Sequence, residues 1–368
     1  HAPLDVGVDA EETIARQGLL AGRDCGPRDR IAVLLVEQAL RLASLVHDLG
    51  HLPFSHDFEY ALDDHLRGHR EARARAQNLL SQGPGGDAVH ERVGYALASV
   101  VQRSIFNERL AGTALSKPAE VALLIAREIL DAPAAPELDA DEHAAVVSWL
   151  HSLVAGELDV DRADYVLRDA RHYGLAAAGY DLDRLVDHLA PVFIEGRLET
   201  TVLPQGVSAA EAFLVARCRM YTWAIYHHKI QQAAAGLRVA IGDLLATGGD
   251  EVQTFMSDID AIASGQAPDE ALERFVDYDD FWWTGLMRRR LRQGVDPRVE
   301  PWLALFTRRR PGPVSLWKRP SEFPEPDRAA WNRRLPGRDD LELRAEWERV
   351  RAELRDGGVL IERLPFRP

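Results

Sequence analysis

HDLGHLPFSHDFE, residues 47–59, follows the most apolar stretch of the chain. That stretch, residues 27–47, is apolar on nearly every side, which predicts a helix in the middle of a domain. Gly50, with a proline shortly after it, is a normal helix-ending signal. His47 and Asp48 therefore stand where a buried helix ends, and a bound cation is the obvious partner for a charge placed there.

The ligand chemistry of this pair favours a metal, because neutral imidazole and carboxylate are standard ligands of divalent transition metals. Adjacent helical residues point about 100° apart. His47 and Asp48 can therefore reach one ion most easily where the helix ends, and Gly50 is expected to supply the turn. For an isolated His-Asp pair, the alternative is a capped helix end with solvated histidines.

A second cluster, ELDVDRADYVLRD, occupies residues 157–169. Asp161, Tyr165 and Asp169 are spaced four apart and share one helical face. A face that offers carboxylate, phenol and carboxylate can hold a metal at one end and a sugar at the other. The alternative is an ordinary solvated face whose carboxylates pair with nearby arginines.

The rest of the chain predicts a mostly α protein with minor β-structure. Helices are expected at residues 56–82, 88–104, 118–131, 140–155 and 159–172, then a long helix from about 208 to 245 and shorter ones to 293. Residues 191–203 predict a β-hairpin that turns at Glu195-Gly196. From about residue 296, short extended pieces at 314–317 and 359–364 suggest a small α+β lobe.

Composition narrows the function classes. The 368 residues carry 58 Asp+Glu against 44 Lys+Arg, a net charge of −14, which argues against binding long nucleic acid or an anionic membrane. The two cysteines, Cys25 and Cys218, rule out a disulfide framework and fit a reducing cytoplasm. No apolar run approaches the roughly 18–20 residues of a membrane span. The first residue is His1, so the N-terminus is expected to be cropped.

The two clusters together resemble the HD-domain metal-dependent phosphohydrolases, and more closely their deoxynucleoside-triphosphate triphosphohydrolase (dNTPase) branch. The resemblance rests on residues 47–59 and 159–169, on Gly174 shortly after, and on the His90-Glu91 step. A third stretch, residues 216–229, is similar to a later helix of that family. The resemblance extends over roughly residues 30–290 and implies an HD-domain helical core with a small α+β C-terminal lobe.

The resemblance implies that His47, Asp48 and Asp161 coordinate a divalent metal ion, which could be Mn, Mg, Fe, Co, Ni or Zn. The family adds a further histidine upstream of the HD pair, where this sequence has only His1. Three possibilities stay open: His1 is that ligand in an altered context, the ligand was lost by cropping, or the site is incomplete. Cropping is the preferred interpretation.

The resemblance also implies roles around the metal. His56 would protonate the leaving 5′-oxygen, since histidine titrates in the right range, with Glu59 or Glu91 orienting it. His51 and His90 would line the same pocket and neutralise phosphate. The remaining assignments concern the substrate: the triphosphate would be held by Arg162, Arg217 and Lys229, the sugar by Tyr165 and Asp169, and the base or sugar by Tyr226.

These assignments predict a cytoplasmic, homo-oligomeric enzyme that hydrolyses deoxynucleoside triphosphates to deoxynucleoside and triphosphate. A second hypothesis keeps the metal but acts on another nucleotide as a phosphohydrolase or phosphodiesterase. A third is a nucleotide sensor with a degenerate metal site. The expected organisation is a core at residues 1–190, its hairpin and helical continuation at 191–295, and the small lobe at 296–368.

Overall fold

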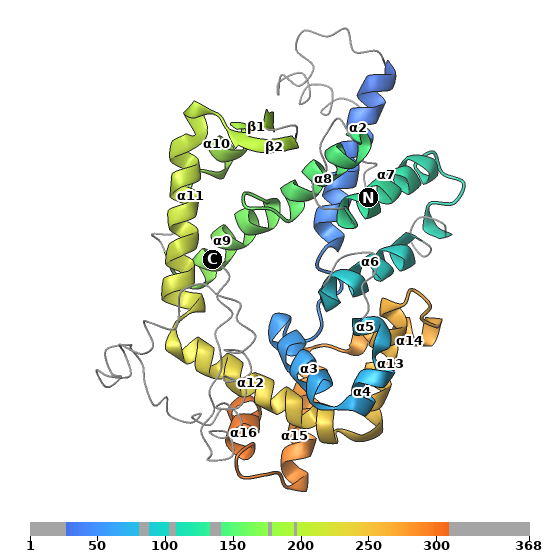
Figure 1. Cartoon of the computed structure of the whole chain (residues 1–368), viewed down its shortest axis with the longest axis vertical. Helices are drawn as coiled ribbons and strands as arrows, with labels where there is room; N and C mark the ends of the chain where they lie inside the picture. Colours follow the sequence, from blue (N-terminus) through green and yellow to red (C-terminus); the bar gives the residue numbers. More distant parts are fainter. Residues whose placement is uncertain are drawn as a thin grey trace. The chain divides into compact units, whose positions relative to one another are not determined.

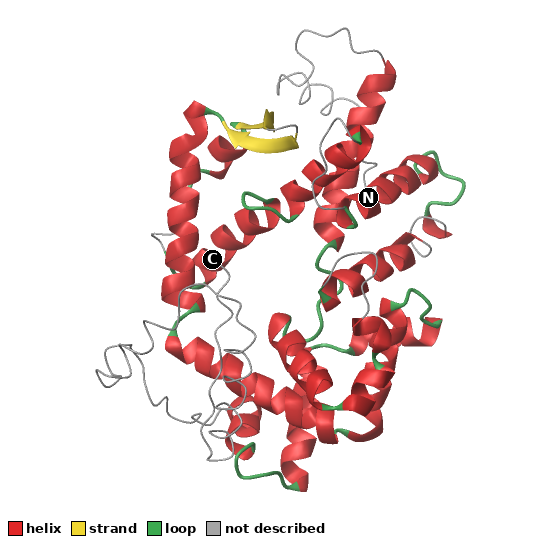
Figure 2. Ribbon diagram, in the orientation of Figure 1, coloured by secondary structure: helices red, strands yellow, loops and turns green. Residues whose placement is uncertain are grey.

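The computed structural model describes residues 27–80, 88–102, 108–132, 141–175, 179–194 and 197–308. This part of the chain is helical apart from one antiparallel hairpin, so the predicted mostly α fold class is confirmed (Figure 2). None of the described helices is long and apolar enough to cross a membrane. The predicted turn at Glu195-Gly196 and the extended pieces beyond residue 308 lie outside the described residues.

The elements are these: α2 (Pro27–Val46), α3 (His56–Gly68), α4 (Arg70–Arg75), α5 (Gln77–Leu80), α6 (Val89–Val101), α7 (Ser116–Leu130), α8 (Glu142–Val154), α9 (Val160–His172), α10 (Leu182–Val186), β1 (Leu189–Ile194), β2 (Arg197–Val202), α11 (Val207–Met220), α12 (His228–Thr247), α13 (Gly249–Ala263), α14 (Asp269–Asp277), α15 (Asp280–Gln293) and α16 (Glu300–Arg308) (Figure 1). A short 3-10 helix (Pro204–Gly206) and a π-helical segment (Tyr221–Ile225) flank α11.

The chain forms two compact units built from interleaved segments. The first takes its described residues from 27–51, 77–221 and 258–272, and the second from 52–76, 222–257 and 273–308. The predicted division into consecutive blocks at 1–190, 191–295 and 296–368 stays a prediction.

The core of the first unit lies where α2 packs against α7 and α8. Ala39 and Ala43 of α2 are fully buried against Leu123 and Ile129 of α7. Small side chains on α2 let the helix backbones approach closely, and the larger aliphatic side chains of α7 fill the space beside them. This packing explains why α2 is apolar almost all round. It also fixes the position of the residues at the C-terminal end of α2.

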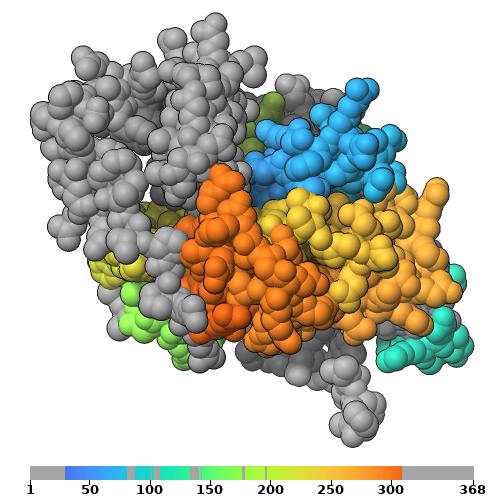
Figure 3. Space-filling model, turned by 90° about the horizontal axis from the view of Figure 1, so that it is seen from below, coloured from blue at the N-terminus to red at the C-terminus, as the bar shows by residue number. Residues whose placement is uncertain are grey.

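The second unit is built around aromatic side chains. Phe58 of α3, Phe255 of α13 and Trp283 of α15 are completely buried, and the Phe58 and Trp283 ring centroids lie 4.8 Å apart, edge to face. Trp302 of α16 packs so closely on Gly236 of α12 that a Cβ there would stand 2.1 Å from the indole. The space-filling view shows α3, α12, α15 and α16 as one continuous mass (Figure 3).

Two predicted helices are wrong in extent. The helix expected over residues 56–82 divides into α3, α4 and α5, because Gly68 ends α3 and His69 is extended, with φ −129° and ψ 99°. The helix expected from about 208 to 245 is interrupted after α11 by the π-helical segment Tyr221–Ile225. Such π-helical turns within helices are frequent at functional sites.

Candidate metal centre

His47 directly follows α2 and has a defined tautomer. Its Nδ1 lies 2.7 Å from the Ser44 carbonyl oxygen, which can only accept, so Nδ1 carries the proton. Nε2 of a neutral ring then presents a lone pair. This Nε2 is buried and makes no hydrogen bond with the part of the chain that the structure describes.

Nε2 of His47 faces two carboxylates. It lies 3.2 Å from Asp48 Oδ1 and 3.9 Å from Asp161 Oδ1, and the three ligand atoms are all within 4.8 Å of one another. A lone pair and two carboxylates cannot satisfy one another by hydrogen bonding, whereas a divalent cation would suit all three. The residues present therefore fit a divalent metal ion.

The electrostatics of the two carboxylates differ. Burial, followed by the negative charge of Asp48, raises the pKa of Asp161 above its ordinary value. Asp48 accepts a hydrogen bond from His51, and this contact, with smaller contributions from the charges of His47 and His51, outweighs burial and lowers the Asp48 pKa. Asp161 thus lacks the compensation that Asp48 has, and a cation between them would supply it.

The start of α9 sets the position of Asp161. Asp159 is the N-cap, is only 5% exposed, and accepts hydrogen bonds from the backbone N–H of Arg162 and from its guanidinium Nη1, at 2.6 and 2.7 Å. This double contact fixes the first helical turn. Asp161, within that turn, is consequently held on the side that faces His47, and its charge is also favoured by the helix dipole.

Gly50 lies in the turn that follows α2, as predicted, and it also has a packing role. Its φ is not left-handed; instead a Cβ there would lie 1.9 Å from the His90 carbonyl oxygen and 2.2 Å from the nitrogen of Gly94, both in α6. The absence of side chains at Gly50 and Gly94 lets α6 touch the loop after α2. That close approach stacks His90 on His51 with 4.2 Å between ring centroids, while Nε2 of His51 lies 3.2 Å from Asp48 Oδ1.

Tyr165, one turn beyond Asp161 on α9, is joined by a residue that the sequence assignments missed. The hydroxyl of Tyr221 lies 3.3 Å from that of Tyr165, and burial together with this hydrogen bond raises the pKa of Tyr165. The guanidinium of Arg217 lies 5.8 Å from the Tyr221 ring centroid and pairs with Glu157 at 3.4 Å. Tyr221 stands inside the third stretch of family resemblance, which was the available signal.

The other substrate residues of the first unit have partners on their own helix. Arg162 pairs with Asp159 at 2.7 Å, and Asp169 lies 3.3 Å from Nε of Arg168. Both side chains remain partly accessible, at 27% for Arg162 and 38% for Asp169. Their proposed contacts with a substrate stay predictions.

Four predicted residues belong to the second unit. His56 begins α3, and its Nδ1 lies 3.7 Å from Glu59 Oε2, so the structure brings this predicted acid and its orienting carboxylate together. Phe54 and Ser55, just before α3, have left-handed φ angles of 60° and 54°. Such backbone is uncommon outside glycine and clusters at functional sites.

The remaining two residues of this unit, Tyr226 and Lys229, lie around the start of α12. Tyr226 is half-buried. Lys229 is exposed, and its Nζ donates to Gln232 Oε1 at 3.2 Å. Their roles in substrate binding stay predictions.

Three comparisons place this chain among known proteins. The sequence family described as the HD associated region matches residues 180–279. The fold is similar to a crystal structure of a phosphohydrolase from Bacteroides thetaiotaomicron, with a TM-score of 0.51 and 21% sequence identity over 82% of this chain and 62% of that one. The helical fold is therefore shared with an enzyme of that name.

Curated relatives are matched over part of their length. The uncharacterised protein YwfO of Bacillus subtilis is 27% identical over 193 residues, which is 52% of this chain and 34% of YwfO. The uncharacterised protein MJ1154 of Methanocaldococcus jannaschii is 38% identical over 76 residues, 21% of this chain and 17% of its own. The family match covers residues 180–279, and the structural likeness shows a shared helical fold.

Proposed function

We propose that this chain is a metal-dependent phosphohydrolase that cleaves deoxynucleoside triphosphates into deoxynucleoside and triphosphate. The observation that carries the proposal is the convergence of His47 Nε2 with Asp48 and Asp161, one helical turn from Tyr165. One of the three candidate ligands, Asp161, thus shares α9 with a phenol suited to a sugar, while His47 and Asp48 approach from the end of α2.

The bound ion would polarise a phosphate oxygen and lower the pKa of a water molecule. His47, Asp48 and Asp161 would hold it. Arg217, whose side chain is only 17% exposed, would contact the triphosphate with a planar guanidinium suited to phosphate oxygens. Glu157, paired with Arg217 and itself 84% exposed, orients that guanidinium until a substrate competes for it.

The sugar would lie along the exposed face of α9. In this proposal the Tyr165 ring packs against C2′ where a 2′-hydroxyl would clash, and Asp169 accepts a hydrogen bond from the 3′-hydroxyl. Tyr221 supports the ring of Tyr165 through their hydroxyl contact. The preference for deoxyribose would then depend on a packing contact rather than on a hydrogen bond.

The leaving 5′-oxygen needs a proton, and His56 is the proposed donor. Its neighbour Glu59 is half-buried, with Oε2 3.7 Å from His56 Nδ1, and would orient the imidazole toward the leaving oxygen. Lys229 and Tyr226 complete the proposed contacts to phosphate and base. The predictions of a homo-oligomer, a cytoplasmic location and a nucleotide as the partner belong to the same proposal.

The decisive experiment is a product analysis. Each dNTP and NTP is incubated with the protein and Mn²⁺ or Mg²⁺, and products are separated by ion-exchange chromatography. Deoxynucleoside with intact triphosphate is the expected result, and it is expected to vanish in a His47→Ala/Asp48→Ala variant. A His172→Ala/Asp183→Ala variant, which changes exposed residues of the same types, should retain the activity.

The other outcomes separate the competing hypotheses. Release of phosphate or pyrophosphate would show a different cleavage position and a different phosphohydrolase reaction. Equal turnover of ribonucleotides would overturn the sugar assignment while leaving the metal assignment intact. No turnover with any nucleotide, despite measurable metal binding, would favour a nucleotide sensor.

A further inference from the structure

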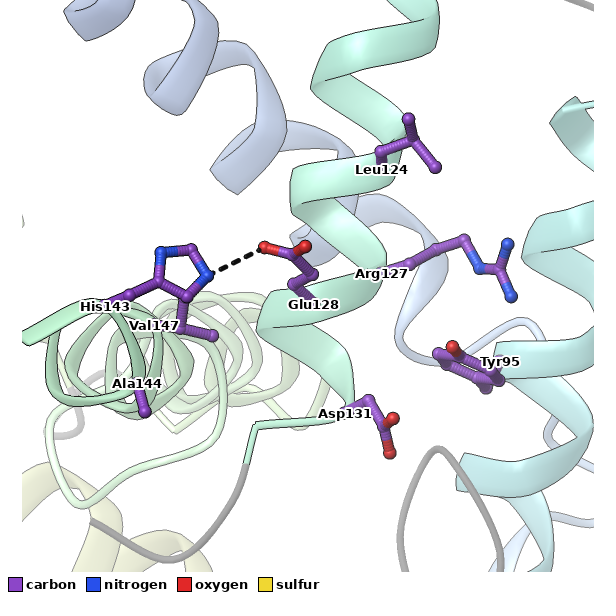
Figure 4. A pocket seen from close by; sticks show the side chains of 8 residues that line it. All are labelled: Tyr95, Leu124, Arg127, Glu128, Asp131, His143, Ala144 and Val147. Carbon is purple, nitrogen blue, oxygen red and sulfur yellow. Dashed lines mark ion pairs between the residues drawn. The ribbon is translucent and has the colours of Figure 1, made fainter. Parts of the chain in front are cut away.

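A cavity of about 320 Å³ lies in the first unit between α6, α7 and the start of α8. Tyr95 comes from α6, Leu124 and Arg127 from α7, and His143 and Val147 from α8 (Figure 4). None of the described residues that line this cavity belongs to the candidate metal centre.

Arg127 is the cation of this cavity and has no counter-ion among the described residues. Its guanidinium carbon lies 4.7 Å from the centroid of the Tyr95 ring, and its Nε is buried without a hydrogen-bond partner in the described part of the chain. Arginine stays protonated in proteins, so the charge cannot be removed by titration. The aromatic face compensates this charge only in part.

The carboxylates nearby do not take up this charge. Glu128 points to the other side of the cavity and pairs with His143 Nε2 at 3.3 Å, as Figure 4 shows. Asp131 also lines the wall and makes no ion pair with Arg127. Leu124 and Val147 add apolar surface, so the cavity combines one guanidinium with an apolar wall and a rim that already carries negative charge.

We propose that this cavity binds a small organic carboxylate, with the carboxylate on the Arg127 guanidinium and an apolar body against Leu124 and Val147. A guanidinium matches a carboxylate with two parallel hydrogen bonds. The nearby carboxylates of Glu128 and Asp131 disfavour a doubly charged phosphate more than a singly charged carboxylate. The proposal is independent of the proposed nucleotide hydrolysis.

The test uses benzoate as the probe, titrated into the whole chain by calorimetry, with benzamide as the uncharged analogue. Benzoate is expected to bind and benzamide to bind at least about 10-fold more weakly. Arg127→Gln should lose benzoate binding by a similar factor. Arg41→Gln, which changes an exposed arginine paired with Glu37 on α2, should leave it unchanged.

Two further variants decide where benzoate binds. Ala144→Leu fills the cavity without changing Arg127 and should also weaken binding, while His47→Ala/Asp48→Ala should bind benzoate as the wild type does. Binding that survives Arg127→Gln, or that disappears in the metal-ligand variant, would overturn the proposal. Inorganic phosphate that binds more tightly than benzoate would overturn the choice of a carboxylate.

Discussion

The lone pair of His47 Nε2 is the atom around which the candidate metal centre is organised. Its tautomer is set by the Ser44 carbonyl, outside the ligand set, and its direction by the end of α2. Contacts of this kind hold a histidine ligand in orientation before the metal arrives. At the scale of single residues, replacing a ligand should therefore affect metal binding far more than folding.

Asp161→Asn should lower the affinity for Mn²⁺ by at least about 10-fold, because losing even an outer contact of a metal ligand costs that much. The metal-free protein should melt at an unchanged or slightly higher temperature, since the change removes the repulsion between Asp161 and Asp48. Calorimetric titration with Mn²⁺ and thermal melts in EDTA measure the two effects. A large fall in the metal-free melting temperature would show instead that Asp161 is structural.

Tyr221→Phe should raise the KM for the nucleotide with a smaller effect on kcat, because Tyr165 loses the hydroxyl that positions its ring. The lost hydrogen bond should also cost about 1 kcal/mol of stability. Tyr180→Phe is the matched control, since the Tyr180 hydroxyl donates to the Ala163 carbonyl of the same helix. It should lose similar stability without a change in KM, and equal KM effects in both variants would contradict the assignment.

The contact between α6 and the loop after α2 is the critical feature at the scale of elements. Gly94→Ala would place a Cβ 3.2 Å from the Gly50 nitrogen and 3.3 Å from the His47 carbonyl oxygen. Because both neighbours are backbone, α6 must move, loosening the stack of His90 on His51. We expect about 1–3 kcal/mol of destabilisation, as in other overpacked cores, and lower kcat for nucleotide hydrolysis.

Gly242→Ala is the control for this substitution. Gly242 lies within α12, where an added Cβ would meet nothing within 4 Å. Alanine should therefore stabilise the helix by about 0.5–1 kcal/mol. Chemical denaturation and steady-state kinetics measure both variants. Unchanged activity and stability in Gly94→Ala would show that the close approach of α6 has no functional consequence.

His65, in the last turn of α3, should make the free energy of unfolding depend on pH. Burial, and then the charge of His69, lower the pKa of His65 below the ordinary histidine value of about 6.5. The folded state thus binds fewer protons than the unfolded state, so the free energy of unfolding falls as the pH drops through 6.5 toward the folded-state pKa. Urea denaturation between about pH 5 and 8 measures this slope, because that range brackets the ordinary histidine pKa.

His65→Gln should flatten that slope, because glutamine does not titrate. His172→Gln changes an exposed histidine at the end of α9 and controls for the loss of a histidine as such. A slope that is the same in wild type and His65→Gln would assign the pH dependence to other groups.

At the scale of the whole molecule, the candidate metal ligands come from parts of the chain far apart in sequence yet within one compact unit. A metal bound only by the folded state stabilises it by mass action, by about 2.7 kcal/mol at 100 times Kd. Mn²⁺ should accordingly raise the melting temperature, and EDTA should reverse the rise. The His47→Ala/Asp48→Ala variant should show no such shift; a shift of equal size would locate the bound metal elsewhere.

Much of the described fold could be predicted because helix formation is mainly local. The apolar run of α2 and the spacing of Asp161, Tyr165 and Asp169 depend only on helical periodicity. The interruption at His69 was missed although Gly68 is a local helix-ending signal. The π-helical segment Tyr221–Ile225 was missed because the sequence there continues a helical pattern.

The sequence by itself determined the helical class and the face of α9 that Asp161, Tyr165 and Asp169 share, since both follow from residue identity and the helical repeat. Only the tertiary structure decided that Nε2 of His47 faces both carboxylates, that Gly50 also serves close packing against α6, and that Tyr221 meets Tyr165. These contacts join distant segments, and their geometry depends on how whole helices pack rather than on any local pattern.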